Sequence, residues 1–141
     1  MWRLFTKRAI QLPDGIAIKQ STLHGNGIFA VKAFSAGAVI EIAPVILMDR
    51  ADKAFLQTTI LFNYYFLVSD ENYPVALGLG YSSLYNHAYK ANATYTISLK
   101  NASIQIRAYS AILPREEITL NYNGSPNDTT PIYFPPDESD I

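Results

Sequence analysis

Short stretches in which apolar and polar residues alternate run through most of the chain, separated by turns that contain glycine or proline. The clearest pair covers residues 94–99 and 103–108, on either side of a turn at residues 100–102. Alternation with a period of two is typical of a strand with one buried face, so this pair predicts an antiparallel hairpin. By the same reasoning, further strands are predicted at residues 16–19, 28–31, 39–42, 45–48 and 117–122.

Helical patterns are scarce along the chain. Residues 50–55 predict one or two helical turns, and residues 79–85 predict a short helix. Pro44 is expected to end the strand that begins at residue 39, because proline has no backbone N–H to donate to a sheet.

An aromatic-rich run at residues 60–68 predicts one more strand, buried on both faces. Its central side chains, Tyr64, Tyr65 and Phe66, are expected in the core. Many short strands with tight turns and little helix indicate a mostly-β fold of small antiparallel sheets.

The length of 141 residues suits a single domain. Residues 1–14 are expected to form an N-terminal leader that ends at a turn, and residues 15–134 are expected to form the domain itself. The acidic tail at residues 135–141 is rich in Pro, Ser and Asp, which predicts disorder.

Composition and charge exclude several classes of function. The chain is 49% hydrophobic and carries a net charge of −1, so it offers no basic surplus for nucleic acid or for an anionic membrane. It has no cysteine and two histidines, which leaves no disulfide framework and no ligand cluster for a metal. No signal peptide or membrane-spanning run is recognisable, so a cytoplasmic location is the simplest expectation.

Three separated motifs carry the candidate chemistry. They are His24-Gly25-Asn26-Gly27-Ile28-Phe29-Ala30, Tyr85-Asn86-His87-Ala88-Tyr89-Lys90-Ala91-Asn92 and Arg115-Glu116-Glu117-Ile118-Thr119-Leu120-Asn121-Tyr122. In this order and at these separations they resemble the motifs of SET-domain protein-lysine methyltransferases, in particular the small single-domain bacterial and viral members. The resemblance covers roughly residues 15–134. It implies the SET fold, with short curled antiparallel sheets, few short helices and a C-terminal segment that passes beneath a preceding loop.

The resemblance also implies an activity, the transfer of a methyl group from S-adenosyl-L-methionine to a lysine amine of a protein or peptide. The cofactor would be held by the glycine turn, by the side chain of Asn86, by the backbone of His87 and by C-terminal aromatic residues. The cofactor-binding residues implied in this way are His24, Gly25, Asn26, Gly27, Asn86, His87, Tyr133 and Phe134. The protein is expected to be a monomer or a homodimer.

Tyr122 is the catalytic residue that the resemblance implies, with a hydroxyl that aligns the amine for in-line transfer. Tyr95 and Tyr85 are assigned to the channel that receives the lysine side chain, because aromatic faces suit an aliphatic stem with a cationic head. Glu116 and Glu117 are neighbours on one predicted strand and so point to opposite faces, which excludes a shared acid–base site.

The chain departs from the family pattern at three positions. Ala88 stands in place of a serine, Ala91 in place of a proline, and Arg115 in place of a glycine. These departures leave open a second interpretation, a divergent SET-like module that binds a peptide or cofactor without turnover. A third is an unrelated β-domain that serves only as an interaction scaffold.

Overall fold

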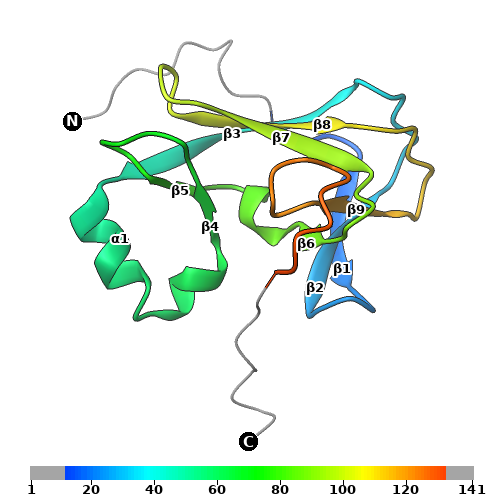
Figure 1. Ribbon diagram of the computed structural model, residues 1–141. Helices are drawn as coiled ribbons and strands as arrows, with labels where there is room; N and C mark the ends of the chain where they lie inside the picture. The colour runs from blue at the N-terminus through cyan, green and yellow to red at the C-terminus, as the bar shows by residue number, and fades with distance from the viewer. Residues whose placement is uncertain (1–11, 133–141) are drawn as a thin grey trace, which may run out of the picture.

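The computed structural model of the chain describes residues 12–132 (Figure 1). The expectations for most of the leader, for Tyr133 and Phe134, and for the tail at 135–141 therefore lie outside the described residues. Within them the fold is mostly β-structure. The elements are β1 (Ile16–Gln20), β2 (Asn26–Ala30), β3 (Val39–Met48), α1 (Arg50–Leu56), the 3-10 helix η1 (Ile60–Asn63), β4 (Tyr65–Leu67), β5 (Val75–Gly78), the 3-10 helix η2 (Ser82–Leu84), β6 (Asn86–His87), β7 (Ala93–Ser98), β8 (Ser103–Ala108) and β9 (Glu117–Leu120).

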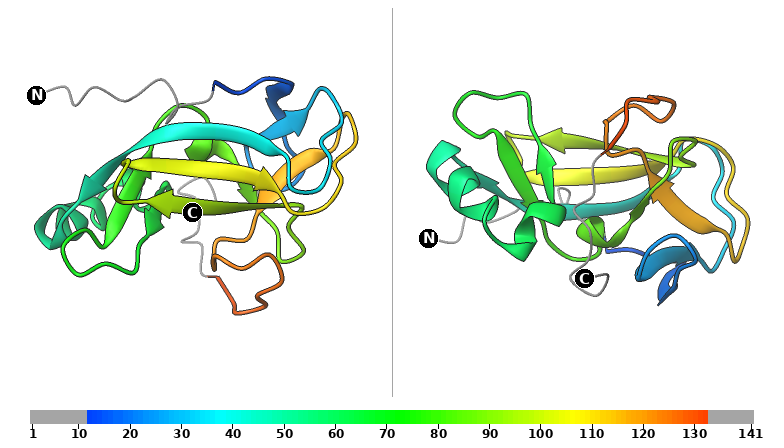
Figure 2. Two further views of the ribbon diagram at one scale, coloured as in Figure 1. Left: turned by 90° about the horizontal axis from the view of Figure 1, so that it is seen from above. Right: turned by 60° about the horizontal axis from the view of Figure 1, so that its bottom comes forward.

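The strands pair in the order β1-β2-β9-β7-β8-β3-β5-β4, and β6 lies off this path beside β9. Figure 2 shows β3, β8 and β7 side by side across the middle of the molecule, with α1 at one end and the β1–β2 hairpin at the other. The core is formed mainly by side chains of β2, β3, β8 and β9. Its fully buried members are mainly aliphatic and include Ile28, Ile104, Ile106, Ile112, Ile118 and Leu120.

The predicted hairpin is confirmed as β7 and β8. Their pairing runs from Ala93 opposite Ala108 to Ser98 opposite Ser103, in one uninterrupted antiparallel register. Ile104 and Ile106 turn the same face of β8 into the core, as alternation requires. The turn closes with Ala102 at a φ of 46°, in the left-handed region.

Strand β3 continues through Pro44, so the expectation that this proline ends a strand is wrong. Pro44 lies opposite Ser103 of β8, and the next residue, Val45, begins the pairing with Gly78 of β5. The carbonyl of Pro44 accepts from Leu79 N at 3.0 Å. The proline stands where the strand changes partners, and a missing N–H is tolerated there because the ladder is already changing sides.

The aromatic run at 60–68 also differs from expectation. Instead of one buried strand it forms η1 and then the short edge strand β4, with Thr59 capping η1 through a bond from Leu61 N. Ile60 is 74% exposed and Leu67 is 67% exposed.

The helix expected near residue 50 is confirmed as α1, capped by Asp49. None of the helices between residues 12 and 132 is long and apolar enough to cross a membrane.

The C-terminal segment packs against the loop that follows β6. Strand β9 pairs in parallel with β6, and the chain then turns so that Asn121 donates to the carbonyls of Tyr89 at 3.3 Å and Asp128 at 2.7 Å. Ala91 N donates to Pro126 O at 3.3 Å. This arrangement is the passage of the C-terminal segment against a preceding loop that the family resemblance implied.

Replacing Arg115 by glycine should stabilise the fold. Arg115 has a φ of 75°, a conformation that costs a residue with a Cβ about 1–2 kcal/mol. Glycine removes this cost but is more flexible in the unfolded chain, so we expect a net gain of about 0.5–1 kcal/mol in the free energy of unfolding. Urea denaturation of wild type and Arg115→Gly measures it.

Ala111→Gly is the matched control, because Ala111 is exposed in the same loop but lies outside the left-handed region. It should lower the free energy of unfolding. If Arg115→Gly lowers it as well, the backbone at this position is not strained.

Candidate active site

Strand β9 brings the three sequence motifs together. Its Ile118 lies opposite Ile28 of β2, while its Thr119 and Leu120 lie opposite Asn86 and His87 of β6. The glycine turn at the start of β2, the Asn-His pair and the end of β9 are therefore neighbours, although they are far apart along the chain (Figure 1).

The side-chain amide of Asn86 lies against the glycine turn. Asn86 is 7% exposed, and its Nδ2 donates to His24 O at 2.9 Å and to Glu117 Oε1 at 2.8 Å, with Asn26 O at 3.3 Å. An amide nitrogen has two hydrogens, so three acceptors surround a group that can satisfy two. We call this arrangement, made of the His24 and Asn26 carbonyls and the Glu117 carboxylate around Asn86, the acceptor corner.

The two glycines of the turn are needed for different reasons. A Cβ added at Gly27 would overlap the Glu117 carboxylate and approach Asn86 Nδ2 to 2.9 Å, so a side chain here would push the acceptor corner apart. Gly25 has a φ of 44°, and nothing lies within 4 Å of an added Cβ. Its requirement is the left-handed conformation rather than a close approach.

His87 links β6 to the residue that the sequence identified as catalytic. Its Nδ1 accepts from the backbone N–H of Tyr122 at 3.1 Å, and its ring stacks edge-on against Tyr89 with centroids 4.6 Å apart. Burial lowers the pKa of the imidazole, although a backbone hydrogen bond to Leu120 acts in the opposite direction. The ring is thus kept neutral, as it must be for Nδ1 to accept a hydrogen bond.

Asn92 holds β9 in place, a role that sequence reasoning missed. Its Nδ2 donates to Glu117 O at 2.8 Å, and its Oδ1 accepts from Thr119 N at 2.9 Å. The amide therefore bonds the backbone of β9 as a neighbouring strand would. The signal was present in the sequence, because Asn92 belongs to the second motif, but nothing in the pattern showed what it would contact.

Tyr122 lies on the wall of a pocket of about 220 Å³. Its hydroxyl donates to the backbone carbonyl of Tyr85 at 2.7 Å. Burial, with smaller effects from Tyr64 and Glu117, raises the pKa of Tyr122 to about 12. The hydroxyl therefore stays protonated at neutral pH and can orient a neighbouring group by hydrogen bonds, rather than serve as a base.

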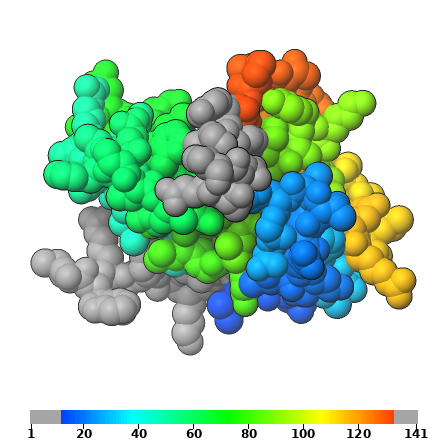
Figure 3. Space-filling view, turned by 90° about the horizontal axis from the view of Figure 1, so that it is seen from below, coloured from blue at the N-terminus to red at the C-terminus, as the bar shows by residue number. Residues whose placement is uncertain are grey.

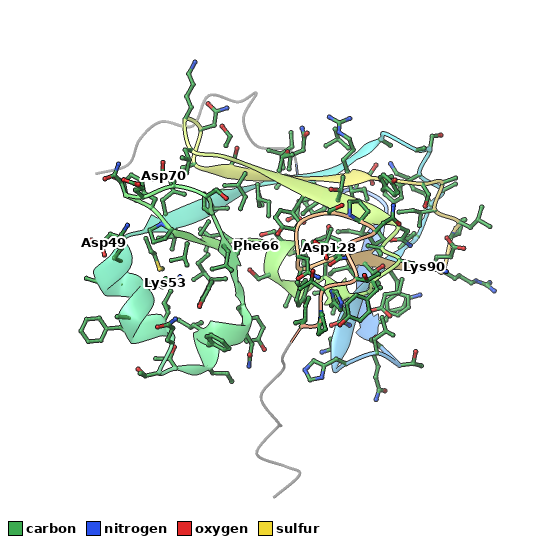
Figure 4. All side chains as sticks on the ribbon, in the orientation of Figure 1. Asp49, Lys53, Phe66, Asp70, Lys90 and Asp128 are labelled. Atoms are coloured by element: carbon green, nitrogen blue, oxygen red, sulfur yellow. The ribbon has the colours of Figure 1, made fainter. Side chains whose placement is uncertain are left out.

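Most of the pocket wall is aromatic and apolar. Tyr95 lines it with its ring 4.9 Å from that of Phe66, and burial raises the pKa of its hydroxyl. Phe66, labelled on β4 in Figure 4, belongs to the η1–β4 wall of the pocket, and Tyr85, Tyr95, Tyr122 and Ile132 belong to the rest of the lining. The lining residues are Phe62, Asn63, Tyr64, Tyr65, Phe66, Leu67, Ser82, Ser83, Tyr85, Tyr95, Tyr122 and Ile132.

The expectation that Tyr64, Tyr65 and Phe66 belong to the core is wrong for Tyr64, which is 40% exposed on the pocket wall. Tyr65 and Phe66 are partly buried on the same wall, and Phe66 also packs against the core. The short strand β4 is an edge strand paired with β5, and its residues 65–67 line the pocket. Aromatic content alone does not distinguish these two environments.

Tyr85 has two roles in this arrangement. It lines the pocket, and its carbonyl holds Tyr122, but its own hydroxyl turns into the core and donates to Glu41 Oε2 at 2.9 Å. Glu41 is 1% exposed and also accepts from Tyr81 N at 3.0 Å. Burial raises the pKa of Glu41 and outweighs these two hydrogen bonds, which lower it. A charged residue in the apolar run of β3 was the available sequence signal for this contact.

The remaining predicted features are placed as follows. Glu116 accepts from Leu113 N, whereas Glu117 contacts Asn86, so the two carboxylates do lie in different environments. Ala91, which stands where the family pattern has proline, uses its N–H to bond Pro126. No group of three or more His, Cys, Asp or Glu side chains between residues 12 and 132 could hold a metal ion.

The donor and acceptor set fits an S-adenosyl-L-methionine molecule at its amino-acid end. That end carries an ammonium with three N–H donors, and the acceptor corner has more acceptors than the Asn86 amide has hydrogens. The glycine turn and Asn86 would hold this end. Tyr122 connects the two parts of the site, because its backbone bonds His87 and its hydroxyl lies at the pocket.

Comparison with known proteins gives three concordant similarities. The model of the family described as "SET domain" matches residues 25–123. The chain is 29% identical over 108 residues to the Schizosaccharomyces pombe protein named histone-lysine N-methyltransferase, H3 lysine-37 specific, a match that covers 76% of this chain and 72% of the relative. It also superposes on the crystal structure of a Plasmodium falciparum protein assigned as a histone methyltransferase. That match has a TM-score of 0.63 and 29% identity, and it covers 81% of this chain and 97% of the other.

Acidification should destabilise the protein through His87. Because the pKa of His87 is lowered on folding, the unfolded chain takes up the proton at a higher pH than the folded chain does. The stabilising contribution is therefore complete above the ordinary histidine value of about 6.5 and is lost as the pH falls through the folded value. The free energy of unfolding, measured between pH 7.5 and 5, should fall less steeply in His87→Gln than in wild type.

His24→Gln serves as the control, because His24 is the second of the two histidines in the chain and is exposed on the glycine turn. It should retain the wild-type pH slope. Equal slopes for wild type and His87→Gln would contradict the assigned role of the His87 ring.

Proposed function

Because the chain belongs to the SET domain family, we propose that it is a protein-lysine N-methyltransferase that uses S-adenosyl-L-methionine. The observation that carries the proposal is the position of Tyr122, which lies at an aromatic pocket on one side and is bonded to the Asn-His pair on the other. When bound, the cofactor supplies a methyl group on a positively charged sulfur. The relative from Schizosaccharomyces pombe makes histone H3 the first protein substrate to test.

The pocket suits a lysine side chain. Its aromatic walls pack against the four-carbon stem, and their low polarity disfavours the charged ammonium form of the amine. A neutral amine has the lone pair that a displacement reaction needs. The Tyr122 hydroxyl and the Tyr85 carbonyl lie 2.7 Å apart, so both can bond an amine that enters here and fix its direction.

Tyr122 contributes alignment rather than proton transfer. With a pKa of about 12, the fraction of phenolate at pH 7 is on the order of one in 10⁵. The neutral hydroxyl is itself held by the Tyr85 carbonyl, and the Tyr85 hydroxyl in turn donates a hydrogen bond to Glu41. The aligning groups are therefore fixed before a substrate binds. Positioning increases the rate because these groups need not be ordered during the reaction.

Tyr122→Phe should abolish most turnover and leave cofactor affinity almost unchanged. The variant removes the aligning hydroxyl and retains the ring, so we expect kcat to fall by about 100-fold or more. Transfer of a radiolabelled methyl group to purified histone H3 and to proteins of a cell extract measures turnover. Titration calorimetry measures cofactor binding.

Tyr109→Phe is a suitable control, because Tyr109 is 51% exposed and is not among the residues that line the pocket. It should behave as wild type. Wild-type turnover in Tyr122→Phe would contradict the role of Tyr122. Failure of the folded wild-type protein to bind S-adenosyl-L-methionine at millimolar concentration would contradict the proposed function.

Tyr95→Phe should shift the products towards higher methylation without a large loss in the rate of the first transfer. The Tyr95 hydroxyl occupies space in the pocket and can bond the amine in one orientation, and a second or third methyl group needs that space. Mass spectrometry of a methylated peptide measures the distribution. Identical distributions for wild type and Tyr95→Phe would reject this assignment, as would a wild-type protein that readily produces trimethyl-lysine.

A further inference from the structure

We infer that Glu117 binds the ammonium group of the cofactor directly and so sets the direction of its amino-acid end. This inference rests on the proposed use of S-adenosyl-L-methionine. It adds a charged side chain to the groups assigned to the amino-acid end of the cofactor, which otherwise are the backbone of the glycine turn and the neutral amide of Asn86.

The Glu117 carboxylate is held on the glycine turn from two sides. Oε1 accepts from Asn86 Nδ2 at 2.8 Å, and Oε2 accepts from the Ser21 hydroxyl at 2.7 Å. An ionised carboxylate can accept about four hydrogen bonds, so these two leave capacity for further donors. Both of its partners are neutral, and they fix the position of the charge without cancelling it.

Within residues 12–132 the one salt bridge joins Lys32 to Asp14, so no side-chain cation of this part of the chain is paired with the Glu117 carboxylate. Glu117 is only partly exposed, and the carbonyl oxygens of His24 and Asn26 converge on the same amide. A partly buried carboxylate surrounded by further acceptors attracts a positively charged donor.

The chemistry of the acceptor corner favours an ammonium over a metal ion. Calcium takes six to eight oxygen ligands, whereas this corner offers one carboxylate and two carbonyls. The Asn86 amide uses two hydrogen bonds of the corner, and the remaining lone pairs of the Glu117 carboxylate and of the two carbonyls can accept from an ammonium. The negative charge of Glu117 would also direct the cofactor's own carboxylate away from the turn, because like charges repel at short range.

Gly27 shows that the close packing of this corner constrains the sequence. The missing Cβ is what allows Glu117 and Asn86 to meet above the turn.

Figure 3 shows the β1–β2 hairpin (blue) at one side of the lower face and the α1–β4 region (green) at the other. The acceptor corner includes residues of the β1–β2 hairpin, and the pocket that Tyr122 lines includes residues of η1 and β4.

The test compares three ligands that differ only in the amino-acid end: S-adenosylhomocysteine, its decarboxylated form S-adenosyl-3-thiopropylamine, and 5′-methylthioadenosine, which lacks that end. Calorimetry with Glu117→Gln should show about tenfold weaker binding of the first two ligands, which carry the amine. Binding of 5′-methylthioadenosine should stay within twofold of wild type. The matched control is Glu116→Gln, which changes the neighbouring carboxylate that contacts Leu113 instead and should change none of the three affinities.

A second variant covers the case in which Glu117→Gln does not fold. Ser21→Ala removes one support of the carboxylate at the edge of the hairpin, and it should weaken the two amine ligands two- to fivefold while sparing 5′-methylthioadenosine. An equal loss for all three ligands, or no loss for the amine ligands, would overturn the inference. If wild type binds none of the three ligands, the proposed function fails and this inference fails with it.

Discussion

Asn92 bonds the backbone of β9 with its side-chain amide, and the candidate active site depends on that contact. The amide accepts from Thr119 N and donates to Glu117 O, so one side chain satisfies two backbone groups of a four-residue strand. With β2 on one side and β6 alongside, β9 is bonded from several directions at once. Glu117 at its beginning and Tyr122 just after its end are thereby fixed on either side of the Asn-His pair. If the strand shifted by one residue, both side chains would change faces.

Tyr85 couples the core of the protein to the pocket. Its phenol is buried against Glu41, and its carbonyl holds the hydroxyl of Tyr122. A buried carboxylate is costly unless it is hydrogen-bonded, and Glu41 has partners from both Tyr85 and Tyr81. The polar contact thus specifies one rotamer of Tyr85 where an apolar contact would tolerate several. The backbone that carries the carbonyl is fixed as a consequence.

Local pattern was sufficient for the parts of the fold that depend on neighbours in the chain. The β7–β8 hairpin and α1 follow from alternation, turn residues and a cap within a few positions. The path of β3 through Pro44 could not be read locally, because it depends on where the strand exchanges β8 for β5. The parallel contact of β6 with β9 joins residues that are more than thirty positions apart, and no periodicity records such a pairing. The motifs indicated which segments lie together in the site, but not that Asn92 bonds the backbone of β9 or that Glu117 contacts Asn86.

The departures from the family pattern act on the backbone and not on the groups that face the pocket or the acceptor corner. Ala91 supplies an N–H that proline lacks, and this N–H bonds the segment after β9. Ala88 donates its N–H to Leu120 O, a contact that any residue other than proline can make. Arg115 occupies a left-handed conformation that glycine adopts without strain, so the presence of arginine here lowers the stability of the fold. All three lie at positions where the main chain forms the contact, and divergence there leaves Asn86, Glu117 and Tyr122 in place. The three departures therefore provide a weak argument for loss of activity, since none removes a side chain that the proposed chemistry uses.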